Sequence, residues 1–173
     1  MNNKLLVLLL LVSFTVSSQE LMSFNGHKGY KATSQWNFIC ENYALTGFVN
    51  VQIAKTDTNG ILKLAVETTN PKFIIAGTIY VYLTDNTIIT CLDKGNSEVN
   101  GNTIIGYYSF SNSEMEKLKN TDIASIRFNI KGDYNVFSSQ LGNFTAYNKT
   151  SLIESSNNKV KRKYVTAKEL TSL

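Results

Sequence analysis

Side chains able to perform covalent chemistry are few in this sequence of 173 residues. His27 is its single histidine, and it lies in a polar stretch near the N-terminus. Nucleophilic dyads and triads need a base held in an enclosed position, so a catalytic role for His27 is the less favoured interpretation. The Gly-x-Ser-x-Gly, His-Glu-x-x-His and Cys-x-x-Cys patterns and a phosphate-binding glycine loop are absent. These absences disfavour the common hydrolase, metalloprotease, nucleotide-binding and redox mechanisms.

Carboxylates are the remaining candidates for catalysis. A glycosidase needs two of them facing each other across a cleft. The available acidic residues are Glu41, Glu67, Asp85, Asp93 and Glu98. The sequence brings no two of them together, so solvated surface carboxylates are the simpler interpretation. We predict no metal site and no cofactor, because two cysteines and a remote histidine lack the paired spacing of metal ligands.

Aromatic residues are the stronger candidates for binding, since the chain has nine tyrosines, nine phenylalanines and one tryptophan. Tyr80 and Tyr82 share one face of a predicted strand, and exposed aromatic rings are common on recognition surfaces. Tyr107 and Tyr108 occupy a later strand. Arg127 takes an outward position on another strand, where it could bind an anion. These five residues form the predicted binding set, although filling a β core is the simpler interpretation of the aromatic ones.

Cys40 and Cys91 are the only cysteines and stand 51 positions apart. In an oxidising compartment such a pair is commonly bridged. Closing a loop of this size would contribute about 4 kcal/mol in the chain-entropy model. The sequence therefore favours a disulfide between them, and two separately buried thiols are the alternative.

Residues 1–18 have the three parts of a secretory signal peptide. Lys4 gives a positive start, residues 5–12 are all apolar, and small side chains precede Gln19. This apolar run is much shorter than the ~20 residues of a membrane-spanning helix. We predict cleavage between Ser18 and Gln19, a secreted or periplasmic location, and no transmembrane segment in the mature chain.

Composition and charge indicate one globular domain. The hydrophobic fraction of 43% supports a sizeable core, and the charged fraction of 17% is low for a disordered chain or a coiled coil. A net charge of +4 is too small to indicate a nucleic-acid partner. After the signal peptide, the sequence divides into a polar leader at 19–35, a β-rich domain at 36–148, and a basic tail or edge element at 149–173.

The first predicted hairpin joins Phe48–Ala54 to Ile61–Thr68. Asn59-Gly60 is a strong two-residue turn signal because both residue types tolerate positive φ. This turn pairs Ile53 with Val66. One face of the hairpin then carries the apolar residues Val49, Val51, Ile53, Leu62, Leu64 and Val66.

A second hairpin is predicted around Asp85-Asn86, between Thr78–Thr84 and Thr87–Asp93. A two-residue turn there puts Ile88 and Leu92 on the same face as the apolar residues Ile79, Val81 and Leu83. The same turn puts Ile89 and Cys91 on the face of Tyr80 and Tyr82. Both faces are rather apolar, which is typical of a strand buried on two sides or of one facing a ligand.

One short helix is predicted over residues 112–120. Ser111 and Glu114 have the spacing of a capping box, while Phe110 and Met115 have that of a hydrophobic staple. Flanking residues 103–110 and 126–131 have strand character. The fold class is therefore mainly β, a β-rich α+β arrangement in which antiparallel hairpins form an open sheet, sandwich or partial barrel.

The sequence favours a non-catalytic binding or accessory module that recognises a glycan, a peptide or an envelope protein. A small carrier of apolar ligands and a carboxylate-based hydrolase are the alternatives. A binding module requires exposed tyrosines on a flat patch. A carrier requires an enclosed pocket, and an enzyme requires acidic, tyrosine or lysine side chains converging in one cleft.

Overall fold

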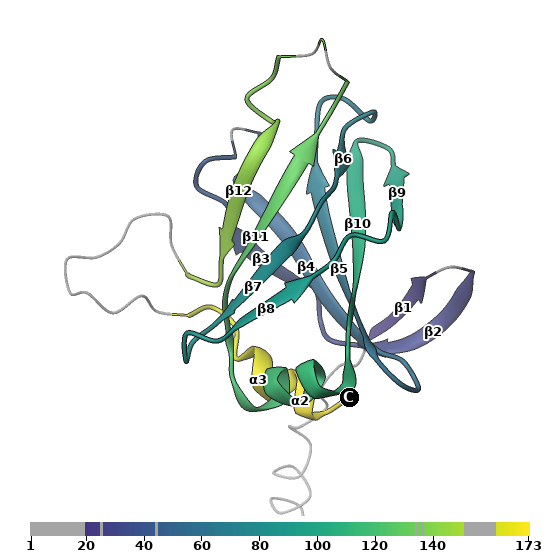
Figure 1. The fold of residues 1–173 in the computed structure, drawn as a ribbon, viewed down its shortest axis with the longest axis vertical. Coiled ribbons are helices and arrows are strands. Elements are labelled where there is room, and N and C mark those ends of the chain that lie inside the picture. The colour runs from purple at the N-terminus through teal and green to yellow at the C-terminus, as the bar shows by residue number, and fades with distance from the viewer. Residues whose placement is uncertain (1–19, 25, 44, 134, 136, 151–161) are drawn as a thin grey trace, which may run out of the picture.

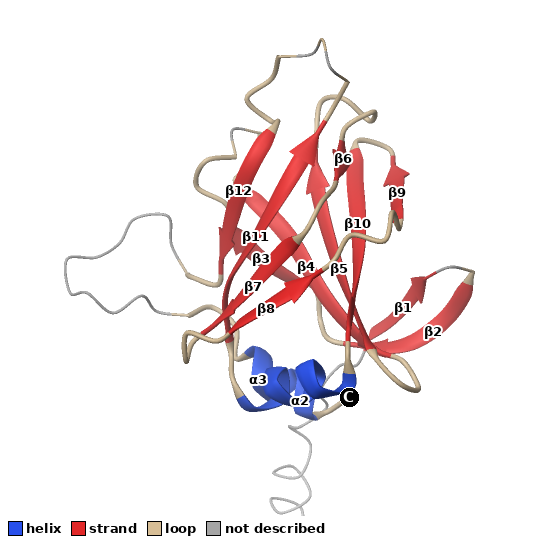
Figure 2. Ribbon diagram, viewed as in Figure 1, coloured by secondary structure: helices blue, strands red, loops and turns tan. Residues whose placement is uncertain are grey.

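A computed structural model describes residues 20–24, 26–43, 45–133, 135, 137–150 and 162–173. The predicted signal peptide lies outside these ranges. The described chain confirms the mainly antiparallel β fold class, as an open sheet curled into a half-barrel (Figure 1). Two short helices lie together at one end of the curled sheet (Figure 2).

The strands are β1 (Glu20–Phe24), β2 (His27–Ala32), β3 (Trp36–Ile39), β4 (Phe48–Lys55), β5 (Gly60–Glu67), β6 (Ile74–Ile75), β7 (Ile79–Leu83), β8 (Ile88–Cys91), β9 (Ser97–Asn100), β10 (Thr103–Phe110), β11 (Ile123–Lys131) and β12 (Gly142–Tyr147). The helices are α2 (Asn112–Asn120) and α3 (Thr166–Thr171). Neighbouring strands follow the order β8-β7-β11-β12-β3-β4-β5-β10-β9. Off this path, β1 pairs with β2, β2 with β4, and β6 with β11.

The concave side of the sheet is filled by large apolar side chains. Its fully buried aromatic residues are Trp36, Phe38, Phe73, Phe110 and Phe128. Aliphatic residues at alternate positions of the strands complete the same cluster. Because successive side chains of a strand point to opposite faces, this filled interior leaves the intervening residues on the outer face.

The β4–β5 hairpin has the predicted inward face, but its predicted register is wrong. Ile53 pairs with Leu62, four residues from the predicted partner Val66. The turn is longer than two residues, because the Thr56 amide donates to the Asn59 carbonyl at 2.8 Å and the Asn59 amide donates to Thr56 Oγ1 at 2.9 Å. A shift by an even number of residues keeps the same side chains inward, so the predicted apolar face survives.

In the β7–β8 hairpin, the side chains of β8 point to the opposite faces from those predicted. Its loop is one residue longer than a two-residue turn: Asn86 adopts φ 68° and its amide donates to the Leu83 carbonyl at 3.1 Å. A one-residue change in register turns every side chain of the second strand over. Ile89 and Cys91 are consequently buried, whereas Ile88 is 51% exposed.

The predicted helix is confirmed as α2, with its capping box. The Ser111 amide donates to Glu114 Oε2 at 2.7 Å, and the Glu114 amide faces Ser111 Oγ at 3.4 Å. Met115 and Leu118 are its buried residues. Met115 packs against Gly60 and requires that this position carry no side chain, since a Cβ built at Gly60 would lie 2.1 Å from the Met115 sulfur. The start of β5 thus accommodates the helix.

An N-terminal hairpin, β1–β2, occupies the segment in which the sequence indicated only a polar leader. It packs on the outer face of β4, β5 and β10 and forms a second, smaller apolar cluster. The buried members of that cluster are Met22, Ala32, Ala54, Ile61, Ala65, Ile105 and Tyr107. Small residues such as Ala54 and Ala65 let the hairpin approach the sheet closely.

Residues 162–173 fold back on the domain through partly buried polar contacts. Glu169 of α3 accepts hydrogen bonds from Trp36 Nε1 at 3.0 Å and from the Ser34 amide at 3.1 Å. Asp122 accepts the Ala167 amide at 2.9 Å at the start of the helix. Much of the predicted basic tail, residues 151–161, lies outside the described residues.

The predicted disulfide is absent, because Cys40 and Cys91 are both free and buried. Cys40 directly follows β3 and Cys91 ends β8, with β7, β11 and β12 between those strands in the sheet. Neighbouring strands are about 4.8 Å apart, whereas bridged cysteines need Cα atoms within about 7 Å. The alternative of two separately buried thiols is the one observed.

Burial makes both thiols sensitive reporters of unfolding at alkaline pH. It raises the pKa of Cys40 from 9.0 to about 11 and that of Cys91 to about 12. The unfolded chain therefore loses these protons first, so the free energy of unfolding should fall as pH rises from about 9 toward 11 and stay unaffected by these groups below 9. Denaturant titrations across this range would measure the fall, which a Cys91→Val variant should make shallower.

A thiol reagent supplies the matching kinetic measurement. At about pH 8 the native chain should label slowly at both cysteines, and denaturant should expose both at once. Rapid labelling of the native chain at this pH would contradict the conclusion that both cysteine thiols are buried and protonated.

Candidate functional site on the outer sheet face

The structure separates the five predicted binding residues into three environments. Tyr80, Tyr82 and Arg127 lie together on the outer face of the sheet. Tyr107 lies beneath the N-terminal hairpin, and Tyr108 points into the filled interior. The predicted set is therefore brought together only in part.

The pairing of β7, β11 and β12 positions the first group. Tyr80 stands opposite Arg127, and Arg127 stands opposite Thr145 on the other side. One row along, Tyr82 and Tyr147 flank Ser125. Residues opposite one another in antiparallel strands have Cβ atoms roughly 5 Å apart, so these side chains form a continuous surface. We call the surface of Tyr80, Tyr82, Arg127, Thr145 and Tyr147 the Tyr80 face.

The Tyr80 face is accessible to solvent, and its arginine has hydrogen-bond donors that no other described residue uses. Tyr80 is 38% exposed, Tyr147 is 39% exposed, and Arg127 is also exposed. Within the described part of the chain, the Arg127 guanidinium has neither a hydrogen-bond nor an ion-pair partner. Five N–H donors in a planar fork are thus available to a ligand.

Thr145 and Tyr147 are the two members of this face that were not in the set predicted from the sequence. The alternation of residues 142–147, with Phe144 and Ala146 buried, could have placed Tyr147 outward. Lys149 Nζ lies 5.2 Å from the centre of its ring and also pairs with Glu41. The ring is thereby held beside a positive charge.

A mostly apolar row extends from this face across six neighbouring strands, from β8 to β4. Its members, in strand order, are Ile88, Tyr82, Ser125, Tyr147, Ile39 and Phe48. Phe48 is 44% exposed at one end, and Ile88 is 51% exposed at the other. The corrected register of β8 is what brings Ile88 onto this surface.

Tyr107 borders a different site, a cleft of about 350 Å³ between the N-terminal hairpin and the sheet. Its hydroxyl donates a hydrogen bond to Glu98 of β9. Burial raises the pKa of Tyr107 above its usual range, with the Glu98 hydrogen bond adding to the effect. We call this site the hairpin cleft; its lining also includes Lys63, Gln52 and Phe24.

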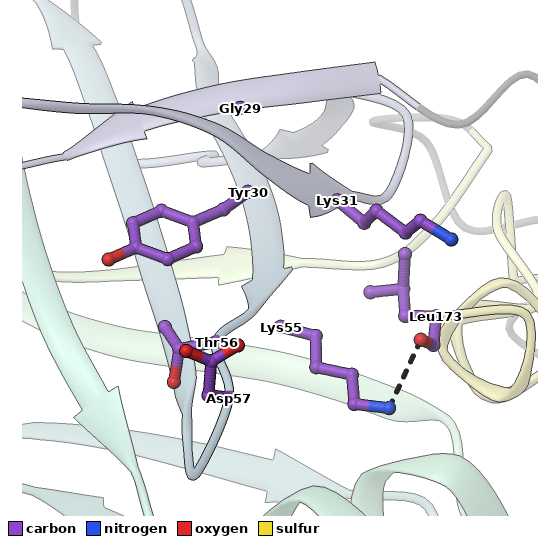
Figure 3. Close-up of a pocket in the computed structure, with 7 residues that line it drawn as sticks. All are labelled: Gly29, Tyr30, Lys31, Lys55, Thr56, Asp57 and Leu173. Carbon is purple, nitrogen blue, oxygen red and sulfur yellow. Dashed lines mark hydrogen bonds between the residues drawn. The ribbon is translucent and has the colours of Figure 1, made fainter.

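A second cavity, of about 490 Å³, lies between β2, the β4–β5 turn and Leu173 (Figure 3). Lys31, Lys55 and Asp57 supply its charges. Lys55 Nζ is already engaged, since it donates to the Leu173 carbonyl at 3.2 Å. The cavity is open to solvent, and nothing in its lining selects one ligand chemistry.

Tyr108 has the structural role in the core that is the simpler interpretation of the aromatic residues. It is 3% exposed, its hydroxyl donates to the Gly77 carbonyl at 3.3 Å, and burial raises its pKa. Its ring helps to fill the interior, so it is not available to a ligand on the surface.

Within the described ranges, no three His, Cys, Asp or Glu side chains form a group that could hold a metal ion. Nor does any helix there have the length and apolar character needed to cross a membrane. No protein-family model, curated protein or solved structure matches the chain.

Proposed function

We propose that this chain is an exported, non-catalytic binding module that recognises a glycan on its Tyr80 face. The observation that carries the proposal is the cross-strand pair of Tyr80 and Arg127. Both side chains are exposed, and the guanidinium has no partner within the described residues. The exported location rests on the signal-peptide pattern of residues 1–18 and is part of the proposal.

The chemistry of this face suits a sugar. A tyrosine ring offers a flat apolar surface to the C–H groups of a pyranose and a hydroxyl at its edge. Arg127 offers paired N–H donors to hydroxyl or carboxylate oxygens, and Thr145 can both donate and accept. Because all three residues stand on paired strands, the backbone is already ordered and only the side chains must be fixed on binding.

A glycan is favoured over a protein partner by the composition of the face. Arg127, Ser125 and Thr145 separate its aromatic rings, so the rings do not form the continuous apolar centre that a protein interface usually has. The carrier alternative has less support, because large side chains fill the concave side of the sheet. The hydrolase alternative also has less support, because the Tyr80 face contains no carboxylate.

The proposal is tested by co-sedimentation of the chain from Gln19 onward with insoluble peptidoglycan, chitin and cellulose, and by affinity electrophoresis in gels that contain soluble polysaccharides. We expect retention by at least one of these polymers and loss of that retention in Tyr80→Ala. Phe137→Ala is the matched control, because Phe137 is a fully exposed aromatic residue of the β11–β12 loop. Absence of retention by all polymers, or equal retention of Tyr80→Ala and Phe137→Ala, would refute the proposal.

A further inference from the structure

The hairpin cleft is separate from the Tyr80 face and has its own floor and walls. Three residues that stand opposite one another on β4, β5 and β10, namely Gln52, Lys63 and Tyr107, run across its floor. Residues 21–24 of β1 form one wall, and Glu98 of β9 belongs to the other. The hairpin projects from the sheet on the side where β9 lies (Figure 1).

Opposite charges line this cleft without neutralising each other. Lys63 is half-buried, and within the described chain its ammonium group has neither an ion-pair nor a hydrogen-bond partner. Glu98 accepts the Tyr107 hydroxyl but forms no ion pair with Lys63. Lys63 carries a partly desolvated charge that a counter-charge from a ligand would stabilise, and Glu98, which is exposed, offers a carboxylate in the same cleft.

The side chains around these charges are held in place. Gln52 Nε2 donates to Glu20 Oε2 at 2.9 Å and to the Thr33 carbonyl at 3.0 Å. The Tyr107 ring contacts Phe24 of the hairpin at a centroid distance of 4.8 Å. The floor and the hairpin wall are therefore fixed before any ligand enters, which lowers the entropic cost of binding.

We propose that the hairpin cleft binds a small zwitterion of the α-amino-acid type. The ligand carboxylate meets the Lys63 ammonium, and the ligand ammonium meets the Glu98 carboxylate. A zwitterion supplies one charge of each sign, and the cleft offers it one residue of each sign, Lys63 and Glu98, that form no ion pair with each other. The cleft volume of about 350 Å³ leaves room for a side chain beside Phe24.

Isothermal titration calorimetry of the wild-type chain with each of the common amino acids tests this proposal. We expect heat of binding for a subset of them. Lys63→Met and Glu98→Gln should each weaken that binding roughly tenfold or more, as expected for losing a charge-assisted hydrogen bond. Lys94→Met, which removes an exposed lysine from a loop, should leave the binding unchanged.

A second measurement assigns each ligand group to its protein partner. The wild-type chain should bind the amino acid more tightly than the analogue in which hydrogen replaces the ammonium group, and Glu98→Gln should lose this discrimination. Lys63→Met should likewise lose discrimination against the amine that lacks the carboxylate. Glycan retention by the Tyr80 face should be unaffected in both variants, so the two proposals can fail independently.

Two results would overturn the assignment. One is the absence of heat and of amide chemical-shift changes at Lys63 and Tyr107 with amino acids at roughly 10 mM, where a site of millimolar affinity would be mostly filled. The other is amino-acid binding that survives both Lys63→Met and Glu98→Gln in chains whose thermal unfolding matches the wild type.

Discussion

Replacing Asn148 with alanine is expected to lower the free energy of unfolding by about 3 kcal/mol. Asn148 is 2% exposed, and its side-chain amide joins three distant backbone groups. Nδ2 donates to the Ile123 and Tyr164 carbonyls, each at 2.9 Å, and Oδ1 accepts the Tyr164 amide at 2.9 Å. Alanine would leave these groups unsatisfied and loosen the C-terminal segment from β11.

Equilibrium unfolding in urea, followed by tryptophan fluorescence, measures this loss. Trp36 is a suitable reporter, since it is fully buried and contacts Glu169 of the C-terminal segment. Asn112→Ala is the control, because Asn112 is an exposed residue of α2 and its loss should change stability by less than about 0.5 kcal/mol. Equal stability of the two variants would show that residues 162–173 contribute little to the fold.

Replacing Arg127 with alanine is expected to weaken glycan binding roughly tenfold or more. This loss of affinity corresponds to the free energy of one or two hydrogen bonds from a charged donor. The same change should alter the free energy of unfolding by less than about 0.5 kcal/mol, because Arg127 is exposed and has no partner within the described chain. Arg127→Lys should recover only part of the affinity, since an ammonium group cannot make the paired contacts of a guanidinium.

The control for Arg127 is Lys131→Ala on the same strand. Both residues are exposed cations of β11, but Lys131 stands opposite Ile74 of β6, away from the tyrosines. Affinity electrophoresis with the glycan retained in the polymer panel gives both dissociation constants. An equal loss in Arg127→Ala and Lys131→Ala would indicate attraction to overall positive charge, not a contact made by Arg127.

Local sequence patterns predicted the elements of the fold more reliably than their pairing. Alternation identified the inward face of β4–β5, and the capping-box and staple spacings identified α2. The turns were harder, because the length of a loop depends on contacts such as those of Thr56 and on the positive φ of Asn86. An error of four residues left the faces of β4–β5 intact, whereas an error of one residue inverted β8.

The candidate sites depended on long-range pairing and so were predicted only in part. Alternation correctly placed Arg127 outward and put Tyr80 and Tyr82 on one face of their strand, but nothing in the sequence showed that β7 and β11 are neighbours. Tyr107 and Tyr108 are adjacent in sequence yet face opposite sides of β10, which divides a pair that looked like one cluster. The hairpin cleft was not foreseen, because it exists only when β1 and β2 fold over β4, β5 and β10.

Mapping the bound glycan by two-dimensional NMR tests the central claim most directly. An isotope-labelled chain is titrated with a soluble fragment of the polymer that retains it, and the shifted amide signals are assigned. We predict that the largest shifts fall on residues 80–82, 125–127 and 145–147, which belong to three strands that meet only in the folded sheet. Shifts confined to other surfaces, with these residues unchanged, would contradict a binding role for the Tyr80 face.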